Sequence, residues 1–519
     1  MGCRSYRLPA AGERIVVAGL RLREANASAW RGAGTALPLF SLRSASGFGT
    51  GEFPDLRKLI DWAAATGQRV VQLLPVNDTI RTGTRSDSYP YNAVSSFALH
   101  PLYLSLIGAG LQPDARYRRQ QRRLNALPAV DYEAVMRLKL DWARLLFRRT
   151  WETVRTTDGY AAFETQNRLW LEPYAAFSAL RDRFGTADFR QWGDYARYDE
   201  QRLRVFRNEN RAAIDFYCFL QYHLHSQLSD ASRYARQRGV VLKGDIPIGV
   251  SPSSADVWQY PHLFHLDGQA GAPPDAFAAT GQNWGFPTYD WEAMARDGYG
   301  WWIRRVGGAQ KLCDVLRIDH FRGFASYWAV PYGETTAKGG HWVKGPGTAL
   351  VGVLTGWFQD LDFIAEDLGA PSEEVTALLE ASKLPGMKVL EFAFDPETLS
   401  DYLPHNCGEN SVCYTGTHDN SPLALWREEA DEGELAFAKA YLGLNDEEGF
   451  CEGIIRGGMS CESRLFIAQM QDYLGLGKGC RMNTPGTSSG NWQWRLLPGE
   501  ASEALAERIR ETSRIYGRL

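Results

Sequence analysis

The chain has 519 residues, of which 44% are hydrophobic and 23% charged, with a formal net charge of -4. This length suits one large enzyme-like domain with insertions, or two to three ordinary domains. The nearly balanced charge gives the protein no overall positive potential that would attract nucleic acid or an anionic membrane. We therefore expect neither as a partner.

Cysteine spacing and the N-terminal segment bear on the compartment. The eight cysteines include no CxxC pair, which indicates neither a zinc motif nor a disulfide framework. The first residues have no apolar core of a secretory signal, no window is long and apolar enough to span a membrane, and periodicity assigns residues 1–33 to no element. We expect a cytoplasmic protein with free thiols, no metal and no cofactor.

Eight short, near-continuous apolar runs predict strands that are buried on both faces. They cover residues 36–42, 69–76, 240–248, 313–319, 362–367, 387–395, 411–416 and 465–472. Between several of these runs, apolar residues recur with the spacing of a helix, which predicts helices there. Alternating strands and helices predict an α/β fold, a (β/α)8 TIM barrel over about residues 34–496.

Two long intervals interrupt this alternation. Residues 106–236 have helical spacing and predict an inserted helical subdomain, ending at Gly239 as a helix C-cap. Residues 251–294 combine many Gly, Pro and aromatic residues, so we expect a long irregular active-site loop over the barrel mouth. A terminal helix is expected in residues 497–519.

Acidic residues recur where the predicted strands end, which is where barrel enzymes carry their chemistry. These acids are Asp245, Asp319, Glu366, Asp367, Asp395 and Asp419. Taken singly, each could cap a helix or pair with an arginine. As a set they predict either general acid–base chemistry or a divalent cation.

The stretch DVLRIDHFRG, residues 314–323, places Asp319 at the end of an apolar strand. Arg317 lies two residues earlier on the same face, where it could keep the Asp319 carboxylate ionised, as a nucleophile requires. Neighbours such as Asp319 and His320 point to opposite faces of a strand, which disfavours a shared metal ion.

Several motifs occur in a fixed order along the chain: GDIPIGV, RIDHFRGF, IAEDLG, LPGMKVLEFAFD, YTGTHDN, and RMNTPGT followed by GNWQWR. Their order and spacing resemble the 4-alpha-glucanotransferases, the amylomaltase family (glycoside hydrolase family 77). The resemblance implies a (β/α)8 barrel with helical insertions and no separate C-terminal β-domain.

The resemblance also implies roles by matching position. Asp319 corresponds to the nucleophile, Glu366 to the general acid/base, and Asp419 to the acid that stabilises the transition state. Seven residues are implied in substrate binding: Tyr91, Asp245, Gln282, Trp284, Arg317, His418 and Asp395. The implied reaction is a retaining double displacement through a covalent glycosyl-aspartate.

Segments such as DSYPYNAVSSFALHPLYL resemble more closely the cytosolic plant disproportionating type and its bacterial relatives. That likeness implies maltose or maltooligosaccharides as donors, and glycogen or other α-1,4-glucans as acceptors. A retaining α-glucan hydrolase on the same barrel, a metal-dependent barrel enzyme and a non-catalytic glucan-binding protein stay open as alternatives.

Overall fold

A computed structural model describes residues 31–519 apart from 275–277, 370–371, 399 and 488. Most of the 1–33 segment named above therefore lies outside the described residues. The central sheet has eight parallel strands in the order β10-β11-β12-β1-β2-β3-β6-β9. The strands are β1 (Gly32–Ala36), β2 (Val70–Gln72), β3 (Val241–Ile246), β6 (Val315–Ile318), β9 (Asp362–Ala365), β10 (Gly386–Val389), β11 (Ser411–Tyr414) and β12 (Leu465–Gln469).

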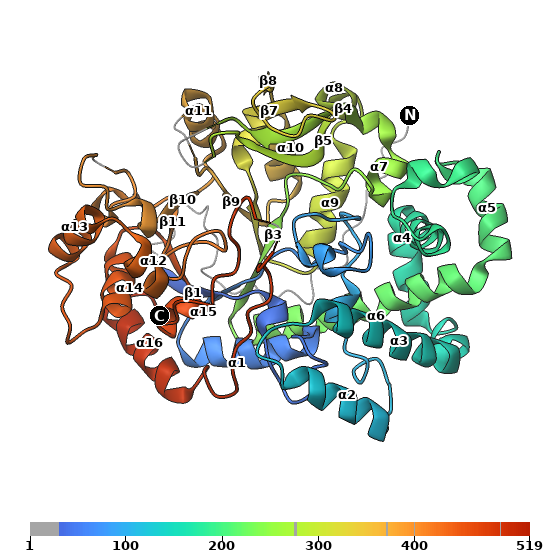
Figure 1. The fold of residues 1–519 in the computed structure, drawn as a ribbon, viewed down its shortest axis with the longest axis horizontal. Helices are drawn as coiled ribbons and strands as arrows, with labels where there is room; N and C mark the ends of the chain where they lie inside the picture. The colour runs from blue at the N-terminus through green and yellow to red at the C-terminus, as the bar shows by residue number, and fades with distance from the viewer. Residues whose placement is uncertain (1–30, 275–277, 370–371, 399, 488) are drawn as a thin grey trace.

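The sheet closes on itself between β9 and β10, where the Ala365 amide donates to the Pro385 carbonyl at 2.9 Å. Inward-facing side chains fill the enclosed space, as small barrels require. They include Val70, Val241, Val315, Ile364, Met387, Val412, Tyr414, Leu465 and Ile467. The predicted (β/α)8 barrel is confirmed (Figure 1).

The first strand was predicted at the wrong place. Residues 36–42 mostly follow β1 and include a buried 3-10 turn at Leu39–Ser41. The strand itself is built from small residues, because a Cβ at Gly34 would lie 2.6 Å from the Val70 carbonyl oxygen. The apolar run at residues 36–42 therefore indicated a buried segment, but the strand itself lies before it.

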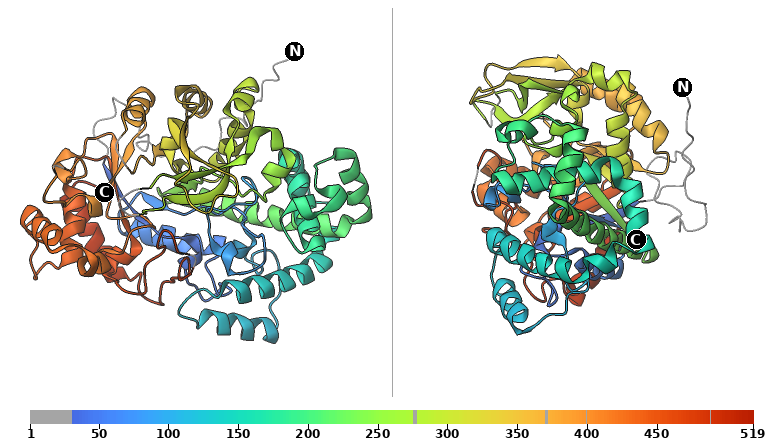
Figure 2. Two further views of the ribbon diagram at one scale, coloured as in Figure 1. Left: turned by 45° about the horizontal axis from the view of Figure 1, so that its top comes forward. Right: turned by 90° about the vertical axis from the view of Figure 1, so that its right-hand side faces the viewer.

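Helices surround the barrel (Figure 2). Between and after the strands lie α1 (Leu56–Ala65), α9 (Gly300–Gln310), α10 (Thr348–Trp357), α11 (Glu373–Ser382), α12 (Leu423–Glu429), α13 (Glu432–Leu442), α14 (Phe450–Ser460), α15 (Met470–Tyr473) and α16 (Glu503–Ile515). In the described residues after β12, α15 and α16 are helical and no further strand follows. No described helix is long and apolar enough to cross a membrane.

The interval before β3 contains five α-helices, which lie on the right of Figure 1. They are α2 (Ala115–Asn125), α3 (Tyr132–Val154), α4 (Asp158–Phe184), α5 (Glu200–Glu209) and α6 (Arg211–Gln237). Gly239 follows α6 with φ +70°, the left-handed conformation expected of a C-cap glycine. A buried ion pair, Lys139 Nζ to Glu52 Oε1 at 2.8 Å, connects α3 to the barrel.

The segment 251–294 is more regular than expected. It contains α7 (Ala255–Gln259), β4 (Phe264–Ala272), β5 (Gln282–Tyr289) and α8 (Trp291–Arg296). With β7 (Ser326–Pro331) and β8 (His341–Lys344), these strands form an antiparallel sheet ordered β5-β4-β7-β8, at the top of Figure 1. The prediction of an irregular loop was wrong, because Gly and Pro inside half-exposed strands hid the pairing.

Candidate active site

Arg317 gathers the acids at the ends of the central strands. Its Nη1 donates to both carboxylate oxygens of Asp245 at 2.8 Å and to Asp319 Oδ1 at 3.1 Å. The guanidinium is almost fully buried inside β6, and Asp319 follows that strand directly. The strand register places Asp245 of β3 directly opposite Arg317, which explains why the guanidinium contacts both oxygens of the Asp245 carboxylate.

Glu366 follows β9 and faces the same guanidinium. Arg317 Nη2 lies 3.8 Å from Glu366 Oε2. Two backbone amides also hold the Glu366 carboxyl: His320 N donates to Oε2 at 2.7 Å, and Leu368 N donates to Oε1 at 3.0 Å. Asp319 and Glu366 therefore share one cationic partner.

The protonation of this pair is set by burial. Burial raises the pKa of Asp319 to about 7, although Arg317 acts to lower it, and the Asp245 and Glu366 charges raise it further. Burial also raises the pKa of Glu366 against the effect of Arg317. These two interacting carboxyls therefore titrate as a pair, and their burial favours the protonated forms.

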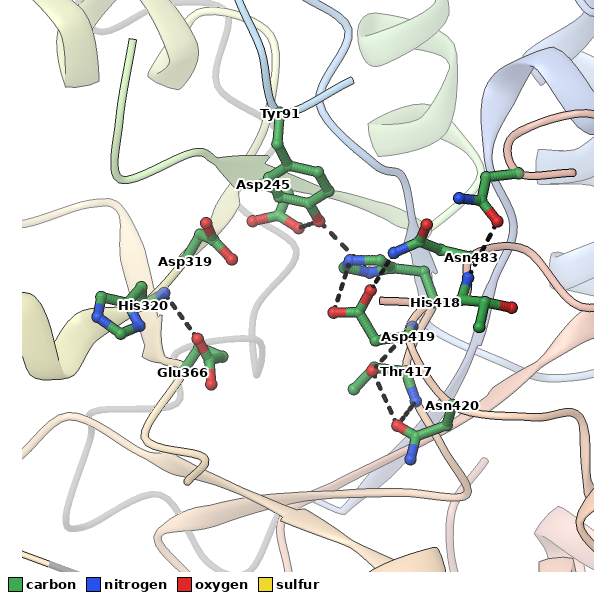
Figure 3. A network of polar contacts seen from close by, with 12 residues as sticks. Tyr91, Asp245, Asp319, His320, Glu366, Thr417, His418, Asp419, Asn420 and Asn483 are labelled. Atoms are coloured by element: carbon green, nitrogen blue, oxygen red, sulfur yellow. Dashed lines mark hydrogen bonds and ion pairs between the residues drawn. The ribbon is translucent and has the colours of Figure 1, made fainter. Parts of the chain in front are cut away.

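Asp419 comes from the turn after β11, residues 417–420. Asn420 Oδ1 fixes this turn by accepting from the Thr417 amide and hydroxyl, both at 2.9 Å. Asn483 Nδ2 donates to Asp419 Oδ1 at 2.6 Å, and Arg481 donates to the Asp419 carbonyl at 3.0 Å. Figure 3 shows the Asp419 carboxylate across an open space from Asp319 and Glu366.

A chain of polar contacts joins the two sides of this space (Figure 3). The Tyr91 hydroxyl donates to Asp245 Oδ2 at 2.7 Å and lies 3.4 Å from His418 Nδ1. The His418 ring stacks on Tyr91 with centroids 4.9 Å apart, and its Nε2 is 3.4 Å from Asp419 Oδ2. Trp492 packs against both rings.

Residues 37–500 match the family model described as 4-alpha-glucanotransferase. The chain belongs to the 4-alpha-glucanotransferase family. Its relatives of that name include one from Aquifex aeolicus, 38% identical over 94% of this chain and 99% of the relative. Another, from Clostridium butyricum, is 35% identical over 88% and 95%.

Two further comparisons refine this membership of the 4-alpha-glucanotransferase family. The rice 4-alpha-glucanotransferase DPE2 is 46% identical over 310 residues, which are 59% of this chain and 33% of that protein. Among solved structures, an amylomaltase from Streptococcus agalactiae, determined with acarbose, superimposes with a TM-score of 0.87 at 31% identity, covering 94% and 99% of the two chains. The predicted enzyme class, a glycosyl-transferring enzyme, is confirmed.

In this 4-alpha-glucanotransferase, β5 brings two predicted binding residues to the active site. Trp284 Nε1 donates to Gln282 Oε1 at 3.1 Å. The Trp284 ring meets the His320 ring edge to face, with centroids 4.7 Å apart. His320 follows Asp319 and its amide holds Glu366, so Trp284 lies beside the segment that carries these acids, and Gln282 contacts Trp284.

Asp395 is placed differently. Its carboxylate accepts from the Glu397 amide at 2.8 Å and the Thr398 hydroxyl at 3.0 Å. These contacts stabilise a turn after β10, as short acidic side chains commonly do. The structure therefore brings together nine of the ten predicted site residues and leaves Asp395 in its own loop.

Asp319 and His320 do not lie on opposite faces of one strand, contrary to the prediction. The strand ends at Ile318, and His320 has φ +47°, in the left-handed region. Its role in the geometry is the amide that holds Glu366. The Arg317 guanidinium places a positive charge among Asp245, Asp319 and Glu366.

Three further contact residues were not assigned from the sequence: Asn483, Arg481 and Trp492. All three stand in the RMNTPGT and GNWQWR segments that carried the family resemblance. The motif was therefore a usable signal, but only the folded barrel shows that Asn483 and Arg481 contact Asp419.

Proposed function

We propose that this enzyme transfers α-1,4-glucan or glucosyl units by a retaining double displacement. Asp319 attacks the anomeric carbon while Glu366 protonates the departing glycosidic oxygen, which gives a covalent glycosyl-aspartate. Glu366 then takes the proton of an acceptor 4-hydroxyl as that oxygen displaces Asp319. The observation that carries the proposal is the contact of one guanidinium, Arg317, with both carboxyls.

The shared arginine supports the retaining geometry. Retaining enzymes need the two carboxyls only about 5 Å apart, with no room for a water behind the sugar. A single guanidinium 3.1 Å from one carboxyl and 3.8 Å from the other keeps them close. Because Arg317 is nearer to Asp319, it favours the Asp319 carboxylate and leaves the shared proton to Glu366.

The remaining residues take supporting roles. Asp419 is about half exposed, so its carboxylate can meet a bound sugar and stabilise the positive charge that develops at the anomeric carbon. Tyr91 and His418 form a stacked aromatic surface beside it, and Asp245 fixes the Tyr91 hydroxyl. These groups fit the sugar on the donor side of the bond that breaks.

The antiparallel sheet above the barrel suits the acceptor side. Trp284 and Gln282 lie beside His320, where an aromatic face and an amide can bind an incoming glucan and exclude water. We propose maltose and maltooligosaccharides as donors, with glycogen or another α-1,4-glucan as acceptor. A cytoplasmic location, the absence of nucleic-acid and membrane partners, and a catalytic unit spanning residues 34–496 remain proposals from the sequence.

A product analysis tests this function. Incubation of the enzyme with maltotriose should release glucose together with chains longer than the starting sugar, because an acceptor glucan resolves the intermediate. A parallel incubation with Asp319→Asn enzyme serves as the control and should leave maltotriose unchanged. Steady release of reducing ends without chain lengthening would identify a hydrolase instead.

A further inference from the structure

Three buried cysteines meet outside the active site. Cys407 precedes β11, Cys413 lies within it, and Cys461 follows α14. Their sulfur atoms all lie within 4.8 Å of one another, and the three residues are 2%, 0% and 3% exposed. The cysteine spacing gave no metal motif because the fold, and not a local CxxC turn, brings these thiols together.

The group lies on the outer side of the barrel wall. Val412 and Tyr414, the neighbours of Cys413, face the barrel interior, so Cys413 faces the helix layer instead. In Figure 1 this region is on the left, where β11, α14 and α16 come together. The catalytic acids stand at the other end, beyond the carboxyl ends of the strands.

Positive charge is held beside the sulfur atoms. The buried Arg518 guanidinium has Nη2 2.8 Å from the Cys461 carbonyl and 3.7 Å from its Sγ. Arg518 also donates to the Gly32 and Met459 carbonyls, at 3.0 and 2.7 Å. The oxygen atoms in these contacts belong to backbone carbonyls and not to carboxylates, so they do not neutralise the guanidinium charge. A cation fixed in this way stabilises a thiolate.

The three thiols also contact one another. The sulfur atoms of Cys407, Cys413 and Cys461 are near neighbours, each within 4.8 Å of the other two. The Cys407 thiol has a further acceptor in the Leu403 carbonyl, at 3.5 Å. Three buried sulfur atoms grouped in this way offer an ion sulfur ligands alone.

We infer that Cys407, Cys413 and Cys461 bind one soft d10 metal ion, with Cu(I) the best match. Three sulfurs at about 2.3 Å from one ion in a plane are about 4.0 Å apart, which fits within the observed 4.8 Å limit. The group contains no carboxylate or imidazole, and thiolates alone select soft ions. Three ligands suit Cu(I) better than zinc, which in structural sites takes four.

Binding would be a structural event. Each S–metal bond forms as a protonated thiol releases its proton to solvent, and Arg518 balances part of the remaining negative charge. The ion would connect the segment before β11, the end of α14 and, through Arg518, the C-terminal end of the chain. Since no catalytic acid belongs to the group, we expect transfer activity to be independent of occupancy below the unfolding temperature.

Metal analysis of the whole protein tests this inference. The chain is produced in medium supplemented with copper or with zinc, purified anaerobically, and its metal content measured by mass spectrometry. We expect one metal ion per chain. Competition between copper and zinc shows which of the two metals the three cysteines prefer. Cys461→Ser and Cys413→Ser should lower affinity at least about tenfold, since losing even an outer-shell partner costs that much. Cys451→Ser, a buried cysteine of α14 outside the group, should bind normally.

Two measurements on the unaltered chain keep the test decisive if the variants fold poorly. Anaerobic titration with Cu(I) should release protons and raise the unfolding temperature in a one-to-one ratio. Failure to bind either metal, or full binding by Cys461→Ser, would overturn the inference. So would conversion of two of the three thiols into a disulfide in the metal-treated protein, because the group would then be a redox pair.

Discussion

The Arg317 guanidinium is the single group that holds Asp245, Asp319 and Glu366 together. Its spacing from Asp319 on one strand predicted their contact, because residues two apart on a strand share a face. The contacts of Arg317 with Asp245 and Glu366 were not predictable, since they depend on the register between β3, β6 and β9. The sequence predicted the strand-end acids as a group. It predicted Arg317 only as a partner of Asp319, and not as the residue that contacts three of these acids.

The pH dependence of activity follows from the pair Asp319 and Glu366. In the proposed double displacement, Asp319 must be ionised to attack and Glu366 must be protonated to donate. The rate should therefore rise through the lower pKa of the pair and fall through the upper one. Because burial raises both pKa values, Asp319 to about 7, the active window should lie near neutrality and not near pH 4. Measurement of kcat/KM against pH checks this.

A matched variant separates the two limbs of that profile. In Glu366→Gln enzyme supplied with a glucosyl fluoride donor, whose leaving group needs no acid, the alkaline limb should disappear and the acid limb should remain. An alkaline limb that persists in this variant would show that another group supplies the proton.

Asn483 is predicted to act by positioning Asp419. Its amide is 2.6 Å from Asp419 Oδ1, and small displacements of catalytic groups cost up to about 100-fold in rate. Asn483→Ala should therefore lower kcat strongly while KM for maltotriose changes little. Asn445→Ala, a change in the exposed loop between α13 and α14, is the control. Equal loss in both variants would argue for a general effect on folding.

At the level of elements, strands that are apolar along their whole length could be predicted from the sequence. Strands of small, polar or Gly- and Pro-rich residues could not. The runs around β6 and β9 were found because both faces of these strands are buried. Strand β1 was misplaced because its residues are small. The antiparallel strands β4 and β5 were missed because Gly and Pro dominate local pattern, whereas cross-strand pairing decides the structure.

Gly34 offers a test of the β1 assignment. A Cβ there would approach the backbone oxygen of Val70 at 2.6 Å, so Gly34→Ala must displace β1 from β2. We expect destabilisation of about 1–3 kcal/mol, the usual cost of overpacking, measured as a shift in the denaturation midpoint. Gly352→Ala is the control.

Gly352 lies in α10 and is exposed, and a methyl group added to it would meet no atom within 4 Å. Alanine at this position should leave stability unchanged or raise it by about 0.5–1 kcal/mol, because alanine favours a helix. A Gly34→Ala protein as stable as the parent would contradict the close packing of β1 on β2.

At the scale of the whole molecule, the active site is assembled from distant parts of the chain. Tyr91 precedes the helical insertion and Asn483 follows the last strand, yet both contact groups around the same open space. Local pattern cannot predict such convergence, because it exists only when the barrel closes. The family resemblance supplied roles for Tyr91 and His418 that periodicity could not.

The covalent intermediate is the most direct test of the double displacement. Glu366→Gln enzyme is incubated briefly with a glucosyl fluoride donor, quenched, digested, and analysed by peptide mass spectrometry. We predict a glycosyl group on Asp319, in the peptide that carries RIDHFRGF, and none in the double variant that also carries Asp319→Asn. A glycosyl group on another residue, or products of inverted configuration with no adduct, would contradict this mechanism.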